Sequence, residues 1–396
     1  MTTEEEKMLR GDYGSAVALA MKLLVTLGDV FEAKKMIKVG SAQVSGISYQ
    51  NIGDPGLRFI EDLSKMKAKA KVYSSLNPAG MDLKKWKEMG INEVFAEKQL
   101  RIINAFNRMR IEPTCTCTPY LIGNRPGIGE HVAWAESSAV VFANSVLGAR
   151  TNREGGPSAL ASALTGLTPF YGYHLDGERK PTHIIRVEAD VGDELGFSIL
   201  GYAVGRMLGQ GVPFFEGLGT PDQEELKALG AGLAASGSIA IYHIANITPE
   251  SRLMTHNDVG SCEKITVENR DLSETLSRLS VEDDFNFVCI GCPHCSLSEI
   301  KRAADMLSGK KVRKRFWIFT SKMIHKEAVK RGFSKAIEKA GAEIIDDTCM
   351  VVSPLNELGI NGVVINSCKA AHYVPSTCRL KVNLRNFEDC INEAIK

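Results

Sequence analysis

Short apolar runs alternate with longer helical segments along the chain, and this alternation predicts an α/β fold. In the first part, the apolar runs at residues 38–44 and 71–74 have the length of buried strands. Each run leads into a polar, glycine-containing turn, at residues 45–48 and 75–80, and such turns suit ligand binding. The helices expected in this part cover residues 15–27, 55–66, 96–109 and 139–147.

Two further units repeat the pattern. In the middle unit, strands are expected at residues 183–187, 213–216 and 238–243, and helices at 196–208 and 222–235. A boundary is expected near residues 249–255. In the last unit, strands are expected at residues 286–290, 315–319, 342–346 and 362–366, and helices at 297–307 and 326–340. A closing strand and helix follow within 380–396. Strands that alternate with helices form parallel sheets with right-handed crossovers.

The expected architecture is therefore a set of parallel sheets flanked by helices, in two or three lobes. We expect an N-terminal lobe at residues 1–180, a middle lobe at 181–255 and a C-terminal lobe at 256–396. A chain of 396 residues is long enough for this number of lobes, each with its own core.

Composition narrows the classes of function. The chain carries 48 Lys and Arg against 47 Asp and Glu, so it has no basic field to attract nucleic acid or an anionic membrane. The acidic N-terminus lacks the apolar segment of a secretory signal, and Lys22 and Asp29 interrupt the best candidate for a membrane span. We therefore expect a cytosolic protein, in which its ten cysteines are mostly thiols available for metal binding or catalysis.

The stretch from Phe285 to Ile300 places a cysteine where α/β proteins bind ligands. A buried strand ends at Gly291, the turn Cys292-Pro293-His294-Cys295 follows, and a helix begins near Ser296 or Ser298. Ligands bind at the carboxyl ends of parallel strands, and the N–H groups of a helix start favour a thiolate. Two simpler interpretations are a pair of packing thiols and half of a zinc site, although the chain has no second cysteine pair at similar spacing.

Other reactive side chains follow strands of the same unit. Cys349 and Lys369 come after strand ends, as Cys292 does, and Cys117 lies in a proline-flanked turn of the first part. Cys117 and Cys292 are 175 residues apart, and Cys292 and Cys349 are 57 apart, which excludes the closely spaced cysteines of ferredoxins. This spacing suits a site assembled from different parts of the fold.

Seven motifs spread over nearly the whole chain resemble the large subunits of the aconitase X family, most closely the archaeal ones. They are QVSGIS (43–48), SLNPAGMD (75–82), CTPYLIGNRP (117–126), WAESSAVVFANSVLGARTNREGGPSAL (134–160), IGCPHCSLSEI (290–300), DDTCMVVSP (346–354) and INSCKAAHYVP (365–375). The resemblance implies an aconitase-like α/β fold whose lobes surround a central cleft.

The resemblance also implies an iron–sulfur hydro-lyase. Cys117, Cys292 and Cys349 match the cluster ligands, most simply of a [4Fe-4S] cluster with one iron not bound by protein, which would act as a Lewis acid on the substrate hydroxyl. Cys115 and Cys295 lie close enough in sequence to replace Cys117 and Cys292, although the motif positions favour the latter two. The other cysteines are interpreted as packing thiols: Cys262, Cys289, Cys368, Cys378 and Cys390.

Substrate contacts are carried over in the same way. The resemblance implies that the substrate is bound by Gly46, Ile47, Ser48, Asn77, Pro78, Glu136, Ser137 and Lys369. Arg150, Asn152 and Arg153 suit recognition of phosphate or carboxylate, and a structural salt bridge explains them equally well. His294 and His372 are expected to cap helices or to hydrogen-bond near a cluster rather than to bind metal.

The implied reaction is dehydration of (R)-5-phosphomevalonate to trans-anhydromevalonate 5-phosphate. The resemblance assigns the base, a serine, to a small partner subunit, so a heterodimer is expected and no catalytic base is assigned on this chain. Two alternatives remain at this point. One is dehydration of cis-3-hydroxy-L-proline on the same scaffold, and the other is a scaffold subunit, stabilised by metal or thiols, with no chemistry of its own.

Overall fold

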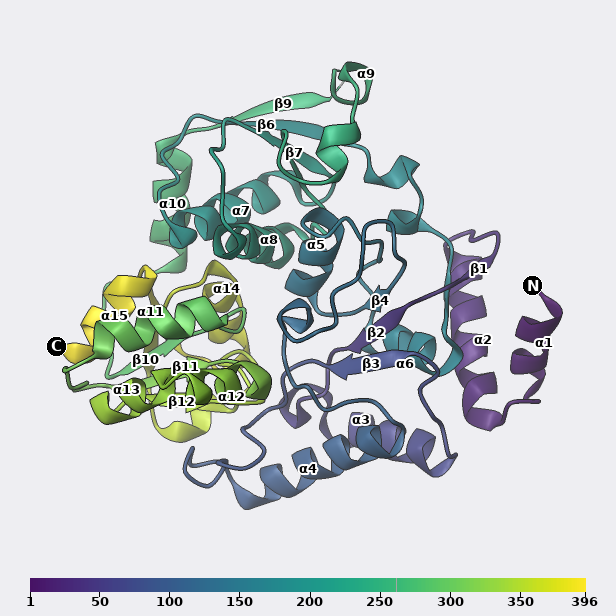
Figure 1. The fold of residues 1–396 in the computed structure, drawn as a ribbon, viewed down its shortest axis with the longest axis horizontal. Coiled ribbons are helices and arrows are strands. Elements are labelled where there is room, and N and C mark those ends of the chain that lie inside the picture. Colours follow the sequence, from purple (N-terminus) through teal and green to yellow (C-terminus); the bar gives the residue numbers. More distant parts are fainter. Residues whose placement is uncertain (261) are drawn as a thin grey trace.

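Three parallel β-sheets, each built from one stretch of the chain, organise the computed structural model, which describes residues 1–260 and 262–396. Figure 1 shows the first lobe on the right with the N-terminus, the third lobe on the left with the C-terminus, and the middle lobe above them. Helices cover the sheets in each lobe. The α/β fold of parallel sheets flanked by helices that the sequence predicted is confirmed.

The first lobe is built on a sheet with the strand order β3-β2-β4. The expected strand at residues 38–44 is instead two strands, because the Gly40 amide bonds the His131 carbonyl while the preceding strand pairs with β5 in a separate antiparallel ribbon. The elements are α1 (Thr3–Arg10), α2 (Ser15–Val30), β1 (Met36–Lys38), β2 (Ser41–Val44), α3 (Tyr49–Lys65), β3 (Tyr73–Leu76), α4 (Glu93–Arg108), β4 (Ala133–Trp134), α5 (Ser137–Ser145), α6 (Gly156–Thr165) and β5 (Leu167–Pro169), with 3-10 turns at Pro119–Leu121, Gly172–His174 and Gly177–Arg179.

The middle lobe has the strand order β8-β7-β6-β9. Its two long helices pack backbone against backbone: a Cβ added at Gly201 of α7 would lie 2.2 Å from the Leu229 carbonyl oxygen of α8. The strand expected at residues 238–243 begins only at residue 243. The elements are β6 (His183–Val187), α7 (Glu194–Leu208), β7 (Pro213–Glu216), α8 (Gln223–Gly237), β8 (His243–Ile244), α9 (His256–Val259), β9 (Glu263–Val267) and α10 (Asn269–Leu279), with a 3-10 turn at Glu250–Leu253.

The boundary expected near residue 255 cuts through this middle sheet. β9 lies beyond that boundary and pairs with β6 along its whole length, from Glu263 to Val267. α10 then packs against α7. The sheet therefore includes residues that the sequence assigned to the C-terminal lobe.

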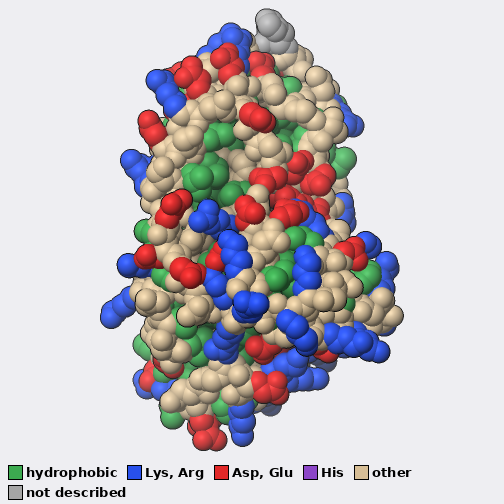
Figure 2. Space-filling view, turned by 90° about the vertical axis from the view of Figure 1, so that its left-hand side faces the viewer, with side chains coloured by type: hydrophobic (Ala, Val, Ile, Leu, Met, Phe, Trp, Pro, Cys, Tyr) green, Lys and Arg blue, Asp and Glu red, His purple; other side chains and the backbone are tan. Residues whose placement is uncertain are grey.

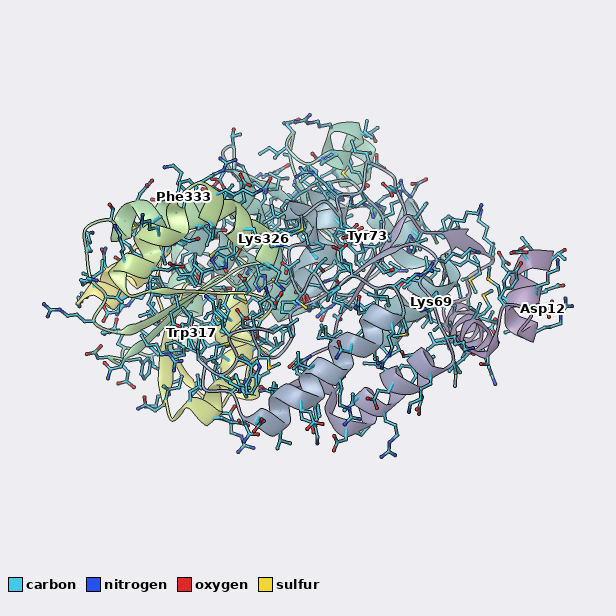
Figure 3. All side chains as sticks on the ribbon, turned by 60° about the horizontal axis from the view of Figure 1, so that its bottom comes forward. Asp12, Lys69, Tyr73, Trp317, Lys326 and Phe333 are labelled. Atoms are coloured by element: carbon cyan, nitrogen blue, oxygen red, sulfur yellow. The ribbon has the colours of Figure 1, made fainter. Side chains whose placement is uncertain are left out.

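The third lobe carries a five-stranded sheet in the order β12-β11-β10-β13-β14. The expected helix at residues 326–340 is two helices, because Gly332 adopts a left-handed conformation (φ 81°) between them. Figure 3 marks Trp317 and Phe333 in this lobe. The elements are β10 (Phe287–Ile290), α11 (Leu297–Leu307), β11 (Arg315–Phe319), α12 (Lys322–Lys330), α13 (Phe333–Ala340), β12 (Glu343–Ile345), β13 (Gly362–Ile365), α14 (Cys368–Thr377), β14 (Lys381–Leu384) and α15 (Phe387–Ile395), with a 3-10 turn at Leu355–Leu358.

The order in which successive strands join this sheet reverses at β10. β11 and β12 add on one side of β10, whereas β13 and β14 add on the other. The crossovers on the two sides of such a point leave a crevice at the carboxyl ends of the strands. Cys292 follows β10 and Lys369 follows β13, so both lie beside this crevice.

Loops at the carboxyl ends of the first and third sheets contact each other directly. The Ala79 amide donates to the Asp347 carbonyl over 2.7 Å, and the Ser48 hydroxyl donates to the Val352 carbonyl over 2.8 Å. The middle lobe joins them through α8, which packs on α5 and α14. The three lobes thus meet around the strand ends.

Both kinds of charged side chain lie on the side of the outer surface where the third lobe lies (Figure 2). Figure 2 shows Lys and Arg side chains among Asp and Glu side chains there. Among the described residues, no single helix is long and apolar enough to cross a membrane, and α1 and α2 meet those criteria only together, as a pair bent by 118°.

Candidate functional site

A cavity of about 420 Å³ lies where the strand ends of the first and third lobes meet. Every residue that the sequence predicted to bind a cluster or a substrate lines it. These residues are Gly46, Ile47, Ser48, Asn77, Pro78, Cys117, Glu136, Ser137, Cys292, Cys349 and Lys369. Residues up to 323 positions apart in the chain therefore share one cavity.

Three thiols reach the cavity from three separate loops. Cys117 precedes the 3-10 turn at residues 119–121, Cys292 follows β10, and Cys349 follows β12. Their exposed fractions are only 5%, 6% and 7%. The alternative ligands Cys115 and Cys295 are fully buried in apolar clusters and do not line the cavity. The geometry therefore favours Cys117 and Cys292.

The three thiols are chemically suited to a positively charged metal centre. Burial raises the pKa of each of them to about 12, because a buried thiolate lacks solvation. A metal centre in the cavity would supply the missing positive charge, and a multi-iron cluster takes one thiolate on each of several irons. Among the described residues, no group of three His, Cys, Asp or Glu side chains lies close enough together to hold a single metal ion.

His294 connects the loops that carry the three cysteines. One ring nitrogen, Nε2, lies 2.8 Å from the Thr348 carbonyl, so it must carry the hydrogen; Nδ1 then accepts from the Thr116 hydroxyl at 3.0 Å. The His294 amide donates to the Cys117 sulfur over 3.2 Å. Burial lowers the pKa of His294 to about 4, so the ring is neutral near pH 7. The residue therefore positions the loops rather than binding metal.

Replacing His294 by leucine is expected to destabilise the metal-free chain. The substitution leaves the Thr348 carbonyl and the Thr116 hydroxyl without their partner in a buried place, which costs about 2–4 kcal/mol in the free energy of unfolding. Urea denaturation followed by circular dichroism measures it. The partly exposed His183 is the control, and its replacement by leucine should change the midpoint little. Equal midpoints for the two variants would contradict this role.

A buried ion pair forms one wall of the cavity. Glu136 caps α5 and pairs with the Lys369 ammonium, while its second oxygen accepts from Asn77 over 2.8 Å. Burial opposes ionisation of Glu136, but the Lys369 charge and three hydrogen bonds outweigh it and hold the pKa of the carboxyl below its usual value. Burial likewise opposes the charge of Lys369, and Glu136 outweighs it and raises the pKa of the amine. Both groups are therefore charged near neutral pH.

A neighbouring part of the lining is the loop that leads from β2, which pairs with β4, to α3. It comprises residues 45–48, and Gly46 adopts a left-handed conformation (φ 69°) that a residue with a side chain rarely takes. Ser48 stands at the start of α3 but donates its hydroxyl to Val352 instead of capping the helix. The N–H groups of Tyr49 and Asn51 are already bonded, to the Gln99 side chain and the Ser48 carbonyl, so the loop rather than the helix start lines the cavity.

Arg150, Asn152 and Arg153, for which the sequence allowed either phosphate recognition or a structural role, have different surroundings in the structure. Arg150 pairs with Asp176 and donates to the His174 carbonyl over 3.1 Å, away from the cavity. Asn152 is buried and bridges two backbone groups of the segment that follows β5, at 2.8 and 3.1 Å. Arg153 alone lines the cavity. The structural interpretation thus holds for the first two.

Sequence reasoning missed part of the lining. Ser45, Asn51, Ala135, Val351, Val352, Tyr373 and Thr377 also line the cavity. Most of them lie within or beside the seven motifs, so proximity to a motif was the available signal. His372, in contrast, lies 2.9 Å from the Tyr202 hydroxyl and does not line the cavity.

Parallel sheets that meet at their strand ends, around thiols and a buried ion pair, define an α/β protein with a small-molecule site between its lobes. Models of three domains match this chain: the aconitase X first domain at residues 1–177, the second at 181–277 and the third at 285–396. The chain belongs to the aconitase X family.

Individual relatives cover the chain from end to end. The phosphomevalonate dehydratase large subunit of Methanocaldococcus jannaschii is 51% identical over 99% of both chains. The crystal structure of Thermococcus kodakaraensis aconitase X in its holo-form has a TM-score of 0.93 at 44% identity, covering 100% of this chain and 99% of that one. The cis-3-hydroxy-L-proline dehydratase of Pseudomonas aeruginosa is 32% identical over 99% of this chain, which spans 69% of that longer protein.

Proposed function

We propose that this chain is the large subunit of an iron–sulfur hydro-lyase that converts (R)-5-phosphomevalonate to trans-anhydromevalonate 5-phosphate. In this reaction a proton leaves C2, the C3–oxygen bond breaks, a C2–C3 double bond forms and water is released. The observation that carries the proposal is that Cys117, Cys292 and Cys349, from three distant loops, line one cavity together with Lys369. Relatives at 45–51% identity that bear the name phosphomevalonate dehydratase large subunit support the substrate.

Three thiolates would hold a four-iron cluster and leave one iron without a protein ligand. When bound, such a cluster supplies Lewis acidity that makes a tertiary hydroxyl a better leaving group. Cys117, Cys292 and Cys349 are the residues that would hold it, because they come from three loops and line the same cavity.

The polar groups of the cavity would bind and orient the substrate. Lys369 offers positive charge to a carboxylate beside the cysteines, and Ser137 at the start of α5 lines the same cavity. Gly46, Ile47, Ser48, Asn77 and Pro78 complete the lining. The first and third lobes line the cavity, and a partner chain over its opening would keep bulk water away from the reacting carbons.

Glu136 is poorly suited to remove the C2 proton. Its oxygens already accept hydrogen bonds from Asn77 and from Ser138, and Lys369 pairs with one of them. Its lowered pKa makes it a weak base. This supports the prediction that the base, a serine, belongs to a partner subunit.

A small partner subunit is supported from two directions. Relatives of matching length are named large subunits, which implies a second chain. The Pseudomonas aeruginosa relative is longer, and this chain spans only 69% of it. We propose a heterodimer with the active site in the cleft between the two chains; its cytosolic location stays a prediction.

Reconstitution with and without the partner tests this function. The large subunit alone should not dehydrate (R)-5-phosphomevalonate, whereas the anaerobically mixed pair should, as followed by the appearance of the conjugated double bond in the ultraviolet. Full activity of the large subunit alone would contradict the two-chain proposal. Turnover of cis-3-hydroxy-L-proline instead would establish the alternative substrate.

Iron and acid-labile sulfide analysis separates the enzyme from a scaffold without chemistry. Several irons and sulfides per chain after anaerobic purification are expected. A colourless chain that contains zinc alone, and that the partner does not activate, would favour the scaffold.

A further inference from the structure

Arg153 stands at the cavity with most of its hydrogen-bonding capacity unused. Its guanidinium makes one long hydrogen bond, 3.4 Å from Nη1 to the Ala234 carbonyl near the end of α8. The side chain is exposed, and it makes no ion pair with a carboxylate of residues 1–260 or 262–396. A guanidinium has five N–H donors, so at least four remain for a ligand.

The backbone on both sides of Arg153 is fixed. Asn152 is bonded to two backbone groups, and the Glu154 amide donates to the Trp134 carbonyl over 3.0 Å. The Glu154 side chain is itself buried against Ser158 and Thr168. A side chain that projects from such a frame loses little backbone freedom when it binds a ligand.

Arg153 also lies on the same wall as the loop at residues 45–48. A Cβ added at Gly156 would lie 2.5 Å from the Ser45 carbonyl oxygen, so the start of α6 packs directly against this loop. Arg153 is three residues before that contact, and both Arg153 and the loop line the cavity. The loop at residues 45–48 and the Arg153 guanidinium therefore form one wall of the cavity.

Charge in the cavity is unevenly distributed. Two cations line it, Lys369 and Arg153, and one carboxylate, Glu136. Lys369 and Glu136 neutralise each other beside the cysteines, which leaves Arg153 as the cation without an anionic partner among the described lining residues. An anionic group of a ligand beside Arg153 would balance this charge.

We propose that Arg153 binds the phosphate of the substrate and selects phosphorylated over unphosphorylated hydroxy acids. This inference rests on the proposed function and assigns its phosphate to the wall formed by Arg153 and residues 45–48. The planar guanidinium can hold two phosphate oxygens at once, which a lysine at the same place cannot do. The carboxylate and hydroxyl of the substrate then lie toward Lys369 and the three cysteines.

The test uses the two-chain enzyme and the variants Arg153→Gln and Arg153→Lys. Loss of a charged, two-pronged contact should raise KM for (R)-5-phosphomevalonate roughly 30- to 150-fold in Arg153→Gln, and less in Arg153→Lys. Inorganic phosphate should inhibit the wild type competitively and Arg153→Gln much more weakly. The control is Arg58→Gln, because Arg58 is an exposed arginine of α3 that does not line the cavity.

The outcomes separate this inference from the proposed function. An unchanged KM and unchanged phosphate inhibition in Arg153→Gln, with an active wild type, overturn the inference and leave the function standing. An equal rise of KM in Arg58→Gln also overturns it. If the wild type does not dehydrate (R)-5-phosphomevalonate, the proposed function fails. Calorimetry of inorganic phosphate binding to the large subunit, wild type against Arg153→Gln, then still decides the role of Arg153, with equal heats overturning it.

Discussion

Cys292→Ala should purify with less than about a tenth of the wild-type iron and lose dehydration by roughly three orders of magnitude. Cys292 is one of three thiols at the cavity and lies where the strand order of the third sheet reverses. With one thiol removed, the two that remain would not hold the proposed cluster in place. Iron and sulfide content after anaerobic reconstitution, together with the assay of the two-chain enzyme, measures both effects.

Two matched cysteine variants serve as controls for this experiment. Cys262 is partly exposed in the middle lobe, and its sulfur lies 3.1 Å from the Pro181 carbonyl, so Cys262→Ala should keep its iron. Cys295 is fully buried and does not line the cavity, so Cys295→Ala should also keep iron. Iron loss in Cys295→Ala with retention in Cys292→Ala would show that the ligands had been assigned the wrong way round.

Lys369→Met should lower both stability and activity. The substitution leaves the Glu136 carboxylate buried without its cation, which costs about 3–5 kcal/mol in the free energy of unfolding. Activity should fall roughly 10²- to 10³-fold, because the positive charge offered to the substrate is lost at the same time. Thermal unfolding of the metal-free chain and kcat/KM of the reconstituted enzyme report the two effects separately.

A second variant distinguishes a structural from a substrate-binding role of Lys369. In Lys369→Met/Glu136→Gln neither partner is charged, so much of the lost stability should return while activity stays low. Lys301→Met, which breaks an exposed pair with Asp305, is the control and should change stability by less than about 1 kcal/mol. Recovery of activity in the double variant would exclude substrate binding by Lys369.

The parts of the fold that depend on local pattern were predictable from the sequence. The runs at residues 286–290 and 315–319 are apolar and uninterrupted, so their interpretation as buried parallel strands matches β10 and β11 within one residue. Pairing between distant segments leaves no such local mark. β1 pairs with β5, and β9 crosses the expected boundary to join β6, through contacts that only the folded chain defines.

The candidate site shows the same division. The turn after β10 and the motifs around Cys117 and Cys349 located the cavity, because strand ends of parallel sheets converge. The sequence could not show which of two neighbouring residues in a turn faces the cavity. Arg150 and Arg153 are three positions apart in one turn, and only the Asp176 carboxylate beside the former shows which of them faces the cavity.

The order of the cavity residues along the chain constrains how the protein can be made in the cell. Lys369 and Cys349 come near the end of 396 residues, so a ribosome has released Cys117 long before its companions exist. During that interval the early thiol has no metal centre to join and depends on the first lobe for shelter from oxidants. If the three thiols hold one metal centre, that centre can be completed only after Cys349 has left the ribosome.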